Sequence, residues 1–487
     1  MSASPITEVP VFGQRIAGVS VPPCDGGGIL KRVSPANPSR VVARFGVATH
    51  KQIDEAVAAA RRAQPEWAAR HPAQRAETLI RAARLLEQRR AELVNWEVAE
   101  SGMLRSLAEM HAGWCVEVLD FYAGLARALS GRSVPLGSSK LGLVIPEPYE
   151  VVVALGPWNF PLSELIWKLA PALAAGCSVI SKPSELTPVT ALIFDEVLIE
   201  AGVPPGLTSV LVGGREVGAA LIQKKDVGLV SLTGGRATGQ AVLTATAQNL
   251  TPTVMELGGK SPIVVLPDAD AIQVAEIIGG AVAYRTGQQC ICPSRVMVIG
   301  DDRRRQEIAE AIHNQLSSLT MGDPDSTDTT LGPVISTDHA NALRQVISDA
   351  SNRSIRVLGG ETVEGAFVHP AIFLVDDETD PTVTEELFGP YTAVQAFADV
   401  ESAIESANRT RYGLAAGIIC GGDTNGAIDI ARKLRAGSVW IDDYGTIELE
   451  LPFGGVGDSG FGRELGMEGL ESFVRWKSIH LNHGSAT

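Results

Sequence analysis

The sequence predicts an α/β protein whose parallel sheets are covered by helices on both faces. Short, fully apolar segments, such as VVVAL at 151–155 and CSVIS at 177–181, alternate with segments of helical periodicity, which is typical of strands buried in a parallel sheet. The same alternation resumes after Gly259 and indicates a second α/β unit. The 487 residues suffice for about two to four domains of ordinary size.

The region before residue 151 is predicted to be mainly helical. Thr49 is a favourable N-cap for a first helix, and a single long helix is expected over residues 73–101, ended by Gly102. Residues 131–148 are rich in Gly, Ser and Pro and predict a hairpin or an extended arm. Further strands are expected at 208–212, 228–232, 263–266 and 295–299, and further helices at 162–175, 269–284 and 304–319.

Composition restricts the classes of function. Hydrophobic residues make up 45% and charged residues 20% of the chain, which is typical of a globular protein and not of a disordered one. The formal net charge of −15 argues against nucleic acid as a partner, because phosphate backbones repel an acidic protein. Six cysteines are too few for a disulfide scaffold in a chain of this length.

The sequence carries no signal for a membrane or a metal. The N-terminus lacks a basic region followed by an apolar one, and no apolar run reaches the ~18 residues of a membrane span. Neither HExxH nor a Cys/His cluster with zinc spacing occurs. We therefore expect a cytoplasmic protein without a membrane partner and without a metal site.

Two turns that follow predicted strands are candidates for nucleotide binding. In TGGRATG, Gly234 and Gly239 lie where a strand gives way to a helix, whose free N–H groups favour a pyrophosphate; a glycine-rich packing turn is the alternative. Lys182 and Glu185 follow the CSVIS strand, where a carboxylate accepts from ribose hydroxyls and a lysine meets a hydroxyl or a phosphate. A solvated turn explains these two residues equally well.

Three residues carry side chains suited to acyl chemistry. Cys290, in GQQCICPSR, is a nucleophile if a base or a positive dipole activates it, and an inert core thiol otherwise. Glu256, in MELGGKSP, serves as a general base or caps the next turn. Asn159, in GPWNFP, donates to an oxyanion or only satisfies turn backbone.

Considered together and in order, these segments resemble the aldehyde dehydrogenase superfamily. The resemblance extends over about residues 48–477. The motifs that carry it are GPWNFP (156–161), KPSE (182–185), TGGRATG (233–239), MELGGKSP (255–262), GQQC (287–290), EELFGP (385–390) and PFGGVGDSGFGRE (452–464).

The resemblance implies the aldehyde dehydrogenase fold. Its parts would be a Rossmann-like cofactor-binding domain (1–124 and 149–258), a second α/β catalytic domain (259–458) and a small β oligomerisation arm (125–148 and 470–487). In the family the arm and the C-terminal strand, here 473–481, pair between subunits, so we expect a homodimer or homotetramer. The apolar LGLVI at 141–145 supports this expectation, since an exposed edge strand of this kind needs a partner.

The resemblance also implies the reaction, which is NAD(P)-dependent oxidation of a small-molecule aldehyde to its carboxylic acid. Cys290 occupies the position of the nucleophile that forms a thiohemiacetal and then a thioester, and Asn159 that of the oxyanion donor. Glu256 matches the general base that activates the hydrolytic water. Glu464 matches an acidic residue used in proton relay, and Lys168 a lysine near the active site.

Cofactor contacts follow from the same motifs. The implied set is Trp158, Lys182, Glu185, Gly234, Gly239, Glu386 and Phe388. Lys182 and Glu185 match contacts to the adenosine ribose, and Glu386 and Phe388 match the pair that holds the nicotinamide ribose and ring. Because Glu185 would repel a 2′-phosphate, NAD is the expected cofactor; Lys182 leaves NADP as the alternative.

The chain departs from the family pattern at four positions. Gly235 stands where Ser is usual, and Gly457 where Lys is frequent. Arg285 and Asp442 each replace a usual Asn, and these two changes compensate one another if the side chains form an ion pair. None of the four removes a catalytic group.

The positions that line the family's substrate tunnel include an unusual carboxylate. They are Phe160, Glu164, Trp167, Tyr284, Gln289, Ile291, Tyr444 and Ile447. Glu164 stands at a normally apolar position. There it binds an ammonium with cation–π help, accepts a hydrogen bond from a hydroxylated aromatic aldehyde, or turns outward or pairs with Arg285. We expect an aromatic aldehyde, with an aminoaldehyde or a semialdehyde as alternatives; Tyr284, where succinate semialdehyde dehydrogenases carry arginine, argues against succinate semialdehyde.

Several other activities use the same residues. A CoA-acylating aldehyde dehydrogenase is disfavoured by Glu256, since the base position in such enzymes is often not a carboxylate. A cysteine esterase and a catalytically silent protein are disfavoured by the retained cofactor motifs and by the complete catalytic set. Cys290 and Cys292 form a CxC pair, which is a redox sensor if Cys290 is a low-pKa thiolate; the alternative is that Cys292 packs as a small apolar residue.

Overall fold

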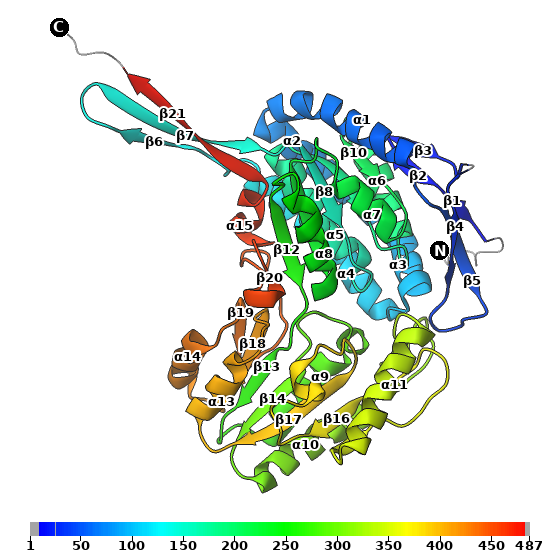
Figure 1. Ribbon diagram of the computed structural model, residues 1–487, viewed down its shortest axis with the longest axis vertical. Helices are drawn as coiled ribbons and strands as arrows, with labels where there is room; N and C mark the ends of the chain where they lie inside the picture. Colours follow the sequence, from blue (N-terminus) through cyan, green and yellow to red (C-terminus); the bar gives the residue numbers. More distant parts are fainter. Residues whose placement is uncertain (1–8, 25, 483–487) are drawn as a thin grey trace.

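The computed structural model describes residues 9–24 and 26–482 and confirms the α/β class. It contains an eight-stranded sheet, a seven-stranded sheet and two three-stranded sheets. Figure 1 shows the eight-stranded sheet in the upper part of the molecule, the seven-stranded sheet below it, and a long hairpin that projects to one side.

The eight-stranded sheet has the order β20-β12-β11-β8-β9-β10-β2-β3. The five strands from β12 to β10 run parallel, and β20 and β2 are antiparallel to their neighbours. The strands are β2 (Gln14–Ile16), β3 (Val19–Val21), β8 (Val151–Leu155), β9 (Ser178–Lys182), β10 (Thr208–Val210), β11 (Leu229–Gly234), β12 (Thr253–Leu257) and β20 (Gly460–Phe461). The predicted strands of this region are therefore confirmed.

Helices cover both faces of this sheet, as predicted. Alternate residues of β8 point to opposite faces, as the pleat of a strand requires. Val151 and Val153 pack with one group of helices, and Val152 and Ala154 pack with α5 on the other face. The first group is α1 (His50–Ala69), α7 (Arg215–Ile222) and α8 (Arg236–Ala247); the second face carries α5 (Pro161–Ala175) and α6 (Val189–Glu200), backed by α2 (Pro72–Gln88), α3 (Arg90–Ser101) and α4 (Arg105–Leu125).

The prediction of one helix over residues 73–101 is wrong, because the chain breaks into α2 and α3. The break lies at Arg89 (φ −99°, ψ 10°), whose guanidinium bonds to Glu92 and Glu196. Leu86 and Leu93 are buried on either side of it, so the apolar periodicity continues through the break and conceals it. Gly102 ends α3 in the left-handed conformation (φ 70°), as expected.

The seven-stranded sheet has the order β15-β16-β17-β14-β13-β18-β19, and all its strands are parallel except β15. The strands are β13 (Pro262–Val265), β14 (Arg295–Ile299), β15 (Arg356–Gly359), β16 (Ala371–Leu374), β17 (Tyr391–Phe397), β18 (Ala415–Ile419) and β19 (Ser438–Ile441). One face packs on α9 (Ala271–Ala283) and α10 (Asp302–Ser317), and the other on α13 (Val400–Asn408) and α14 (Thr424–Lys433). The remaining helices are α11 (Thr337–Asn352), α12 (Pro381–Thr384) and α15 (Gly466–Glu471), with single 3₁₀ turns at Tyr284–Gly287 and Gly457–Ser459.

The two small sheets lie at the periphery. One is β1 (Val11–Phe12), β4 (Ile29–Val33) and β5 (Val41–Gly46); the other, which we call the arm, is β6 (Arg132–Pro135), β7 (Lys140–Pro148) and β21 (Val474–Asn482). The arm hairpin is confirmed, and the pairing of the C-terminal strand between subunits stays a prediction. β21 pairs with β7 of the same chain, so β7 is the central strand and not an exposed edge.

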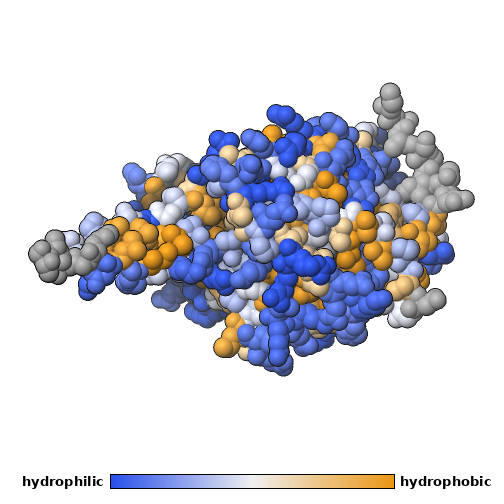
Figure 2. Space-filling model, turned by 90° about the horizontal axis from the view of Figure 1, so that it is seen from above, coloured by the Kyte–Doolittle hydropathy of each residue, from blue (hydrophilic) through white to orange (hydrophobic). Residues whose placement is uncertain are grey.

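The arm still offers apolar surface. Figure 2 shows apolar side chains gathered on the projecting end of the molecule, and the exposed ones include Val134, Leu136, Trp476 and Leu481. Within the described residues, no helix combines the length and apolarity needed to cross a membrane. The same residues contain no cluster of three or more His, Cys, Asp or Glu side chains placed to hold a metal ion.

Candidate active site

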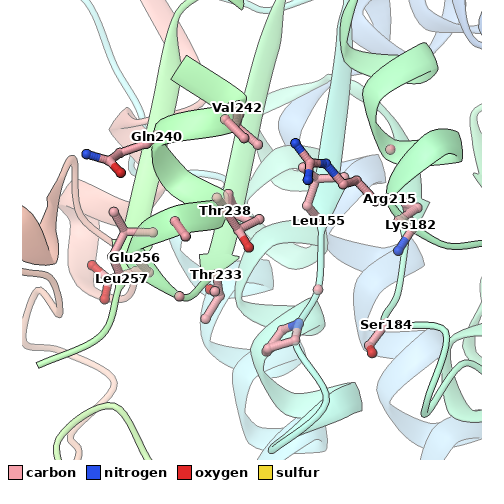
Figure 3. Close-up of a pocket in the computed structure, with 18 of the residues that line it drawn as sticks. Leu155, Lys182, Ser184, Arg215, Thr233, Thr238, Gln240, Val242, Glu256 and Leu257 are labelled. Atoms are coloured by element: carbon pink, nitrogen blue, oxygen red, sulfur yellow. The ribbon is translucent and has the colours of Figure 1, made fainter. Parts of the chain in front are cut away.

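A cavity of about 970 Å³ opens at the carboxyl ends of the central strands of the eight-stranded sheet, where nucleotides bind in open α/β sheets. Figure 3 shows Thr233, Thr238 and Glu256 on one wall, and Lys182, Ser184 and Arg215 on the opposite wall. The cavity brings together nine residues predicted for the site. They are Trp158, Asn159, Lys182, Glu185, Gly234, Glu256, Cys290, Glu386 and Phe388.

One end of the cavity, beside β9, carries two cations and a carboxylate. Lys182 Nζ lies 3.4 Å from Glu185 Oε2, and burial lowers the pKa of Lys182 against the attraction of Glu185. The Arg215 guanidinium lies on the rim and has no partner among the described residues. This end therefore presents both an acceptor for hydroxyl groups and donors for an anion.

The turn between β11 and α8 fits a pyrophosphate. Gly235 caps α8, and a Cβ added there would meet nothing within 4 Å, so the helix N–H groups open onto the cavity. Gly239 lies outside the cavity lining; a Cβ there would come within 2.6 Å of Leu257. Its position therefore permits close packing of α8 on β12 and does not contact the cavity, contrary to the prediction.

At the other end of the cavity, Glu386 and Phe388 are held in place by the backbone and by a histidine. Gly259 N donates to Glu386 Oε1 at 3.0 Å, and a Cβ on Gly258 would come within 2.0 Å of the Glu386 carboxylate. Phe388 has a left-handed backbone (φ 56°), and its carbonyl lies 2.8 Å from His339 Nε2.

His339 is a site residue that the sequence did not reveal. Its ring lines the cavity and contacts Trp158, which packs edge-on against Phe388. The hydrogen bond to Phe388 spans 49 positions in the sequence, so no local pattern marks this histidine.

The thiol, the carboxylate and the amide predicted for catalysis lie at this second end. Cys290 is partly buried, whereas Glu256 and Asn159 are buried. Glu256 Oε1 has no hydrogen-bond partner among the described residues. The three groups reach one cavity from separate segments, namely β12, the turn before α5 and the loop before β14.

One known family matches nearly the whole chain. The model of the aldehyde dehydrogenase family matches residues 24–479. The chain belongs to the aldehyde dehydrogenase family. The expected NAD(P)-dependent aldehyde dehydrogenase and its fold are thereby confirmed at the level of the family.

Solved aldehyde dehydrogenases superimpose closely on this chain. An NAD-dependent aldehyde dehydrogenase from Sinorhizobium meliloti is 31% identical, with a TM-score of 0.94 over 98% of this chain and 96% of that one. Betaine aldehyde dehydrogenase from Staphylococcus aureus, solved in complex with NAD+, is 31% identical, with a TM-score of 0.93 over 97% and 95% of the two chains. A mutant aldehyde dehydrogenase from Bacillus cereus is 33% identical, with a TM-score of 0.93 over 97% and 96%.

In this aldehyde dehydrogenase, Arg285 connects the loop that carries Cys290 to the turn that carries Asn159. Arg285 Nε donates to Asn159 O and Nη2 donates to Ser101 O, both at 2.9 Å. The predicted ion pair between Arg285 and Asp442 does not form. The Asp442 carboxylate instead accepts from the backbone N–H and the thiol of Cys420.

Burial and neighbouring carboxyl groups keep the Cys290 thiol protonated. Burial raises its pKa well above the usual value, and Glu164, Glu256 and Glu386 raise it further. The low-pKa thiolate assumed for a redox sensor is therefore not present in the protein alone. Cys292 is buried, its thiol donates to Gly389 O at 3.9 Å, and burial raises its pKa to about 12.

Lys168 and Glu464 form a buried ion pair next to Glu256. Lys168 extends from α5 to Glu464 and to Thr233 Oγ1, the latter at 2.5 Å. Thr233 lies opposite Glu256 in the register of β11 and β12. On the other side of β12, Gly460 of β20 pairs with Glu256, and the chain reaches Glu464, which bridges to Phe453, a few residues later. Burial, followed by the charge of Glu464, raises the pKa of Glu256.

The predicted tunnel residues fall into two groups. Trp167, Ile291 and Tyr444 share a packed cluster against which Cys290 and Ile447 lie. Phe160 and Tyr284 instead pack beneath α3 and α4. Their neighbour there is His111, whose ring centroid lies 4.7 Å from that of Phe160 and whose Nε2 lies 2.7 Å from the Tyr284 hydroxyl.

Glu164 neither turns outward nor pairs with Arg285. It is 5% exposed, and its Oε2 has no hydrogen-bond partner among the described residues. Burial, against the attraction of Lys168 and together with the charge of Glu464, raises its pKa to about 8. Gln289 points away from this region, since its side-chain amide donates to Ala281 O at 2.6 Å.

Proposed function

We propose that this chain oxidises an aldehyde to its carboxylic acid with NAD+, through a thioester on Cys290. The observation that carries the proposal is the shared cavity, which is lined by Cys290, Glu256 and Asn159 and also by Lys182 and Glu185. This lining supports a site in which a nucleophile, a base and an oxyanion donor would act at the reactive end of a bound dinucleotide.

NAD+ fits the residues present. Glu185 and Lys182 would hold the adenosine ribose, the N-terminus of α8 the pyrophosphate, and Glu386 and Phe388 the nicotinamide ribose and ring. The complex of the Staphylococcus aureus relative with NAD+ supports this choice. When bound, NAD+ would accept the hydride that the substrate carbon releases. NADP is the alternative, because Lys182 and the unpaired Arg215 are available to a 2′-phosphate.

The first chemical step belongs to Cys290 and Asn159. The Cys290 proton passes to Glu256, directly or through one water, and the thiolate attacks the aldehyde carbon to form the C–S bond. The carbonyl oxygen becomes an alkoxide, which accepts from the Asn159 amide and from the Cys290 backbone N–H. When the C=O bond re-forms, the hydride leaves the same carbon and the product is a thioester on Cys290.

Glu256 completes the reaction. After hydride transfer Glu256 releases the proton that it took from Cys290 toward Lys168 and Glu464, the adjacent buried pair, and is a carboxylate again. It then takes a proton from a water, which attacks the thioester, and returns that proton to the Cys290 thiolate as the thiolate leaves and the carboxylic acid forms. A carboxylate with a raised pKa suits this role, because a base that titrates near the working pH both accepts and returns a proton.

We propose an aromatic aldehyde as the substrate, supported by the aromatic walls beside Cys290. Trp167 packs on Phe453 and Trp440 on Tyr444, and flat apolar rings suit such surfaces. The second candidate is an aldehyde bearing an ammonium group, supported by the buried Glu164 carboxyl and by the betaine aldehyde dehydrogenase relative. A semialdehyde or a CoA-dependent reaction remains as a further alternative that the assay below distinguishes.

We also propose a division of the chain into three parts. Residues 1–124 and 149–258 would bind the cofactor, 259–458 would carry the nucleophile, and 125–148 and 470–487, which include the arm, would join subunits into a homodimer or homotetramer in the cytoplasm. The apolar side chains exposed on the arm support the last role, because surfaces of this kind usually meet a partner.

The test follows the reduction of NAD+ by its absorbance, with a panel of aldehydes and with and without CoA. The proposal predicts steady NADH formation without CoA in the wild type and none in Cys290→Ala. A strict requirement for CoA would show that CoA, and not water, accepts the acyl group from the thioester. NADH formation by Cys290→Ala at the wild-type rate would refute the proposal.

A further inference from the structure

Helix α5 carries two polar groups that no described residue satisfies. All of its residues are buried. Ser163 Oγ lies 3.1 Å from His111 Nδ1, and Lys168 is paired with Glu464. Glu164 Oε2 and Trp167 Nε1, by contrast, have no hydrogen-bond partner among the described residues. Buried polar groups in proteins are nearly always hydrogen-bonded, to protein, water or ligand, so these two groups, three residues apart on one helix, are available to a polar group of a ligand.

The two groups belong to the same side of the helix, and one of them acts on the nucleophile. Residues three apart on a helix are neighbours on its surface. The Glu164 carboxyl is close enough to Cys290 to raise the pKa of its thiol, and Trp167 packs against Phe453 with ring centroids 5.5 Å apart. Neither Glu164 nor Trp167 lines the large cavity that reaches Cys290, so the two groups are not among the residues that would hold NAD+.

The other polar groups predicted for this side are already used. The Tyr444 hydroxyl donates to Ile291 O at 2.6 Å. The Tyr284 hydroxyl bonds to His111, and the Gln289 amide bonds to Ala281 O. A polar substituent on a substrate therefore finds its free partners in Glu164 and Trp167.

The chemistry of the two groups selects the substituent. The indole N–H only donates, whereas a carboxyl that keeps its proton both donates and accepts; burial raises the pKa of Glu164 to about 8, so the proton is kept at neutral pH. An ammonium only donates and would leave the indole unsatisfied, and an alkyl group would leave both unsatisfied. A substrate carboxylate would add an unpaired charge, because Lys168, the cation coupled to Glu164, is already paired with Glu464.

We propose that Glu164 and Trp167 form a hydroxyl-recognising pair, and that the substrate is a hydroxylated aromatic aldehyde. The hydroxyl oxygen accepts from Trp167 Nε1–H, and the hydroxyl proton is donated to the Glu164 carboxyl. The formyl group of the same molecule reaches Cys290. This inference rests on the proposed aldehyde oxidation and assigns the specificity of that site.

The test compares kcat/KM for benzaldehyde, 3- and 4-hydroxybenzaldehyde, 4-methoxybenzaldehyde and an aminoaldehyde. We expect at least one hydroxybenzaldehyde to exceed benzaldehyde by about tenfold or more, and the methoxy compound, which cannot donate, to lose most of that advantage. Trp167→Phe keeps an aromatic ring against Phe453 but removes the N–H, and Glu164→Leu removes the carboxyl. Each should bring the hydroxy-to-unsubstituted ratio close to one, while Glu164→Gln, which donates and accepts, should retain part of it.

Folding and function are separated by two further measurements. NAD+ binding by calorimetry shows that each variant is folded, since neither residue lines the cofactor cavity. In the wild type, 4-hydroxyacetophenone should inhibit about tenfold more strongly than acetophenone, which tests the pair without any variant. If no aldehyde reduces NAD+, the proposed function fails. If aldehydes are oxidised but the ratios are equal in all variants, or the aminoaldehyde is preferred through Glu164, the inference is overturned and the function stands.

Discussion

Replacing Arg285 by methionine should slow catalysis by misplacing Asn159. Arg285 donates to Asn159 O and to Ser101 O, both at 2.9 Å, from a buried position. Hydrogen bonds from charged donors contribute about 1.5–3 kcal/mol each, so Arg285→Met removes about 3–6 kcal/mol in total. Part of this loss lowers the free energy of unfolding. The turn that carries Asn159 also becomes more mobile, so its side-chain amide is held less firmly in position.

The expected result is a decrease in kcat of about 10- to 100-fold, which stays below the 10²–10³ effect of removing an oxyanion donor altogether. The KM for NAD+ should change little, because Arg285 does not line the cofactor cavity. The assay is steady-state kinetics together with a thermal melt.

Arg75 provides the matched control for this prediction. It is also buried and donates to the backbone carbonyls of Ala174 and Arg70, but it lies on α2, away from Cys290. Arg75→Met should therefore lower the melting temperature comparably and leave kcat close to wild type. If Arg285→Met keeps the wild-type kcat while its melting temperature falls, Arg285 does not position Asn159 and the reasoning is refuted.

Four further predictions follow from the same geometry. First, kcat/KM should rise with pH above neutrality, because burial raises the pKa of both Cys290 and Glu256 and both must lose a proton; a flat profile between pH 6 and 9 would contradict this. Second, burial raises the pKa of Glu164 from 4.5 to about 8, so between these pH values the native state holds a proton that the unfolded chain releases. The contribution of this proton to the free energy of unfolding is fully present below pH 4.5 and is lost as the pH rises through 8. The pKa shift corresponds to about 5 kcal/mol. In urea titrations, the free energy of unfolding of Glu164→Gln should therefore increase relative to that of the wild type by up to this amount between pH 4.5 and 8. A stability difference between the two proteins that does not change with pH would refute the prediction. Third, Glu185→Ser should raise the NADP-to-NAD ratio of kcat/KM tenfold or more, since a like charge near the 2′-phosphate costs about 1–4 kcal/mol; an unchanged ratio would show that Glu185 does not discriminate. Fourth, Trp476→Glu with Leu481→Glu on the arm should dissociate an oligomer seen by light scattering, and a wild-type monomer at micromolar concentration would exclude that role.

The sequence predicted the parts of the fold that depend on local patterns. β8 begins and ends where its apolar run does, and β14 extends its apolar run by one residue, Arg295, because a strand buried on both faces is mostly apolar. The end of the cavity proposed to bind the nucleotide could also be predicted, since Lys182 and Gly234 are the last residues of such strands. The break at Arg89 was not, because the buried face continues through it.

Contacts between distant segments could not be predicted from one sequence. Arg285 and Asn159 are 126 positions apart, and His339 and Phe388 are 49 apart. The ion pair expected between Arg285 and Asp442 failed for the same reason, since charge complementarity does not determine which groups meet. The high pKa of Cys290 likewise depends on carboxyl groups contributed by three separate elements, which no local motif reveals.

The most direct test of the central claim is the detection of the thioester in Glu256→Gln. This variant keeps the nucleophile but lacks the carboxylate that takes the thiol proton and activates water, so it should complete hydride transfer once, more slowly than the wild type and faster at high pH, and then stop. We predict a burst of one NADH per active site and a mass increase equal to the acyl group, located by fragmentation on Cys290, only when both aldehyde and NAD+ are present. Steady turnover by this variant, an acyl group on Cys292, or NADH formation without any covalent adduct would contradict the account.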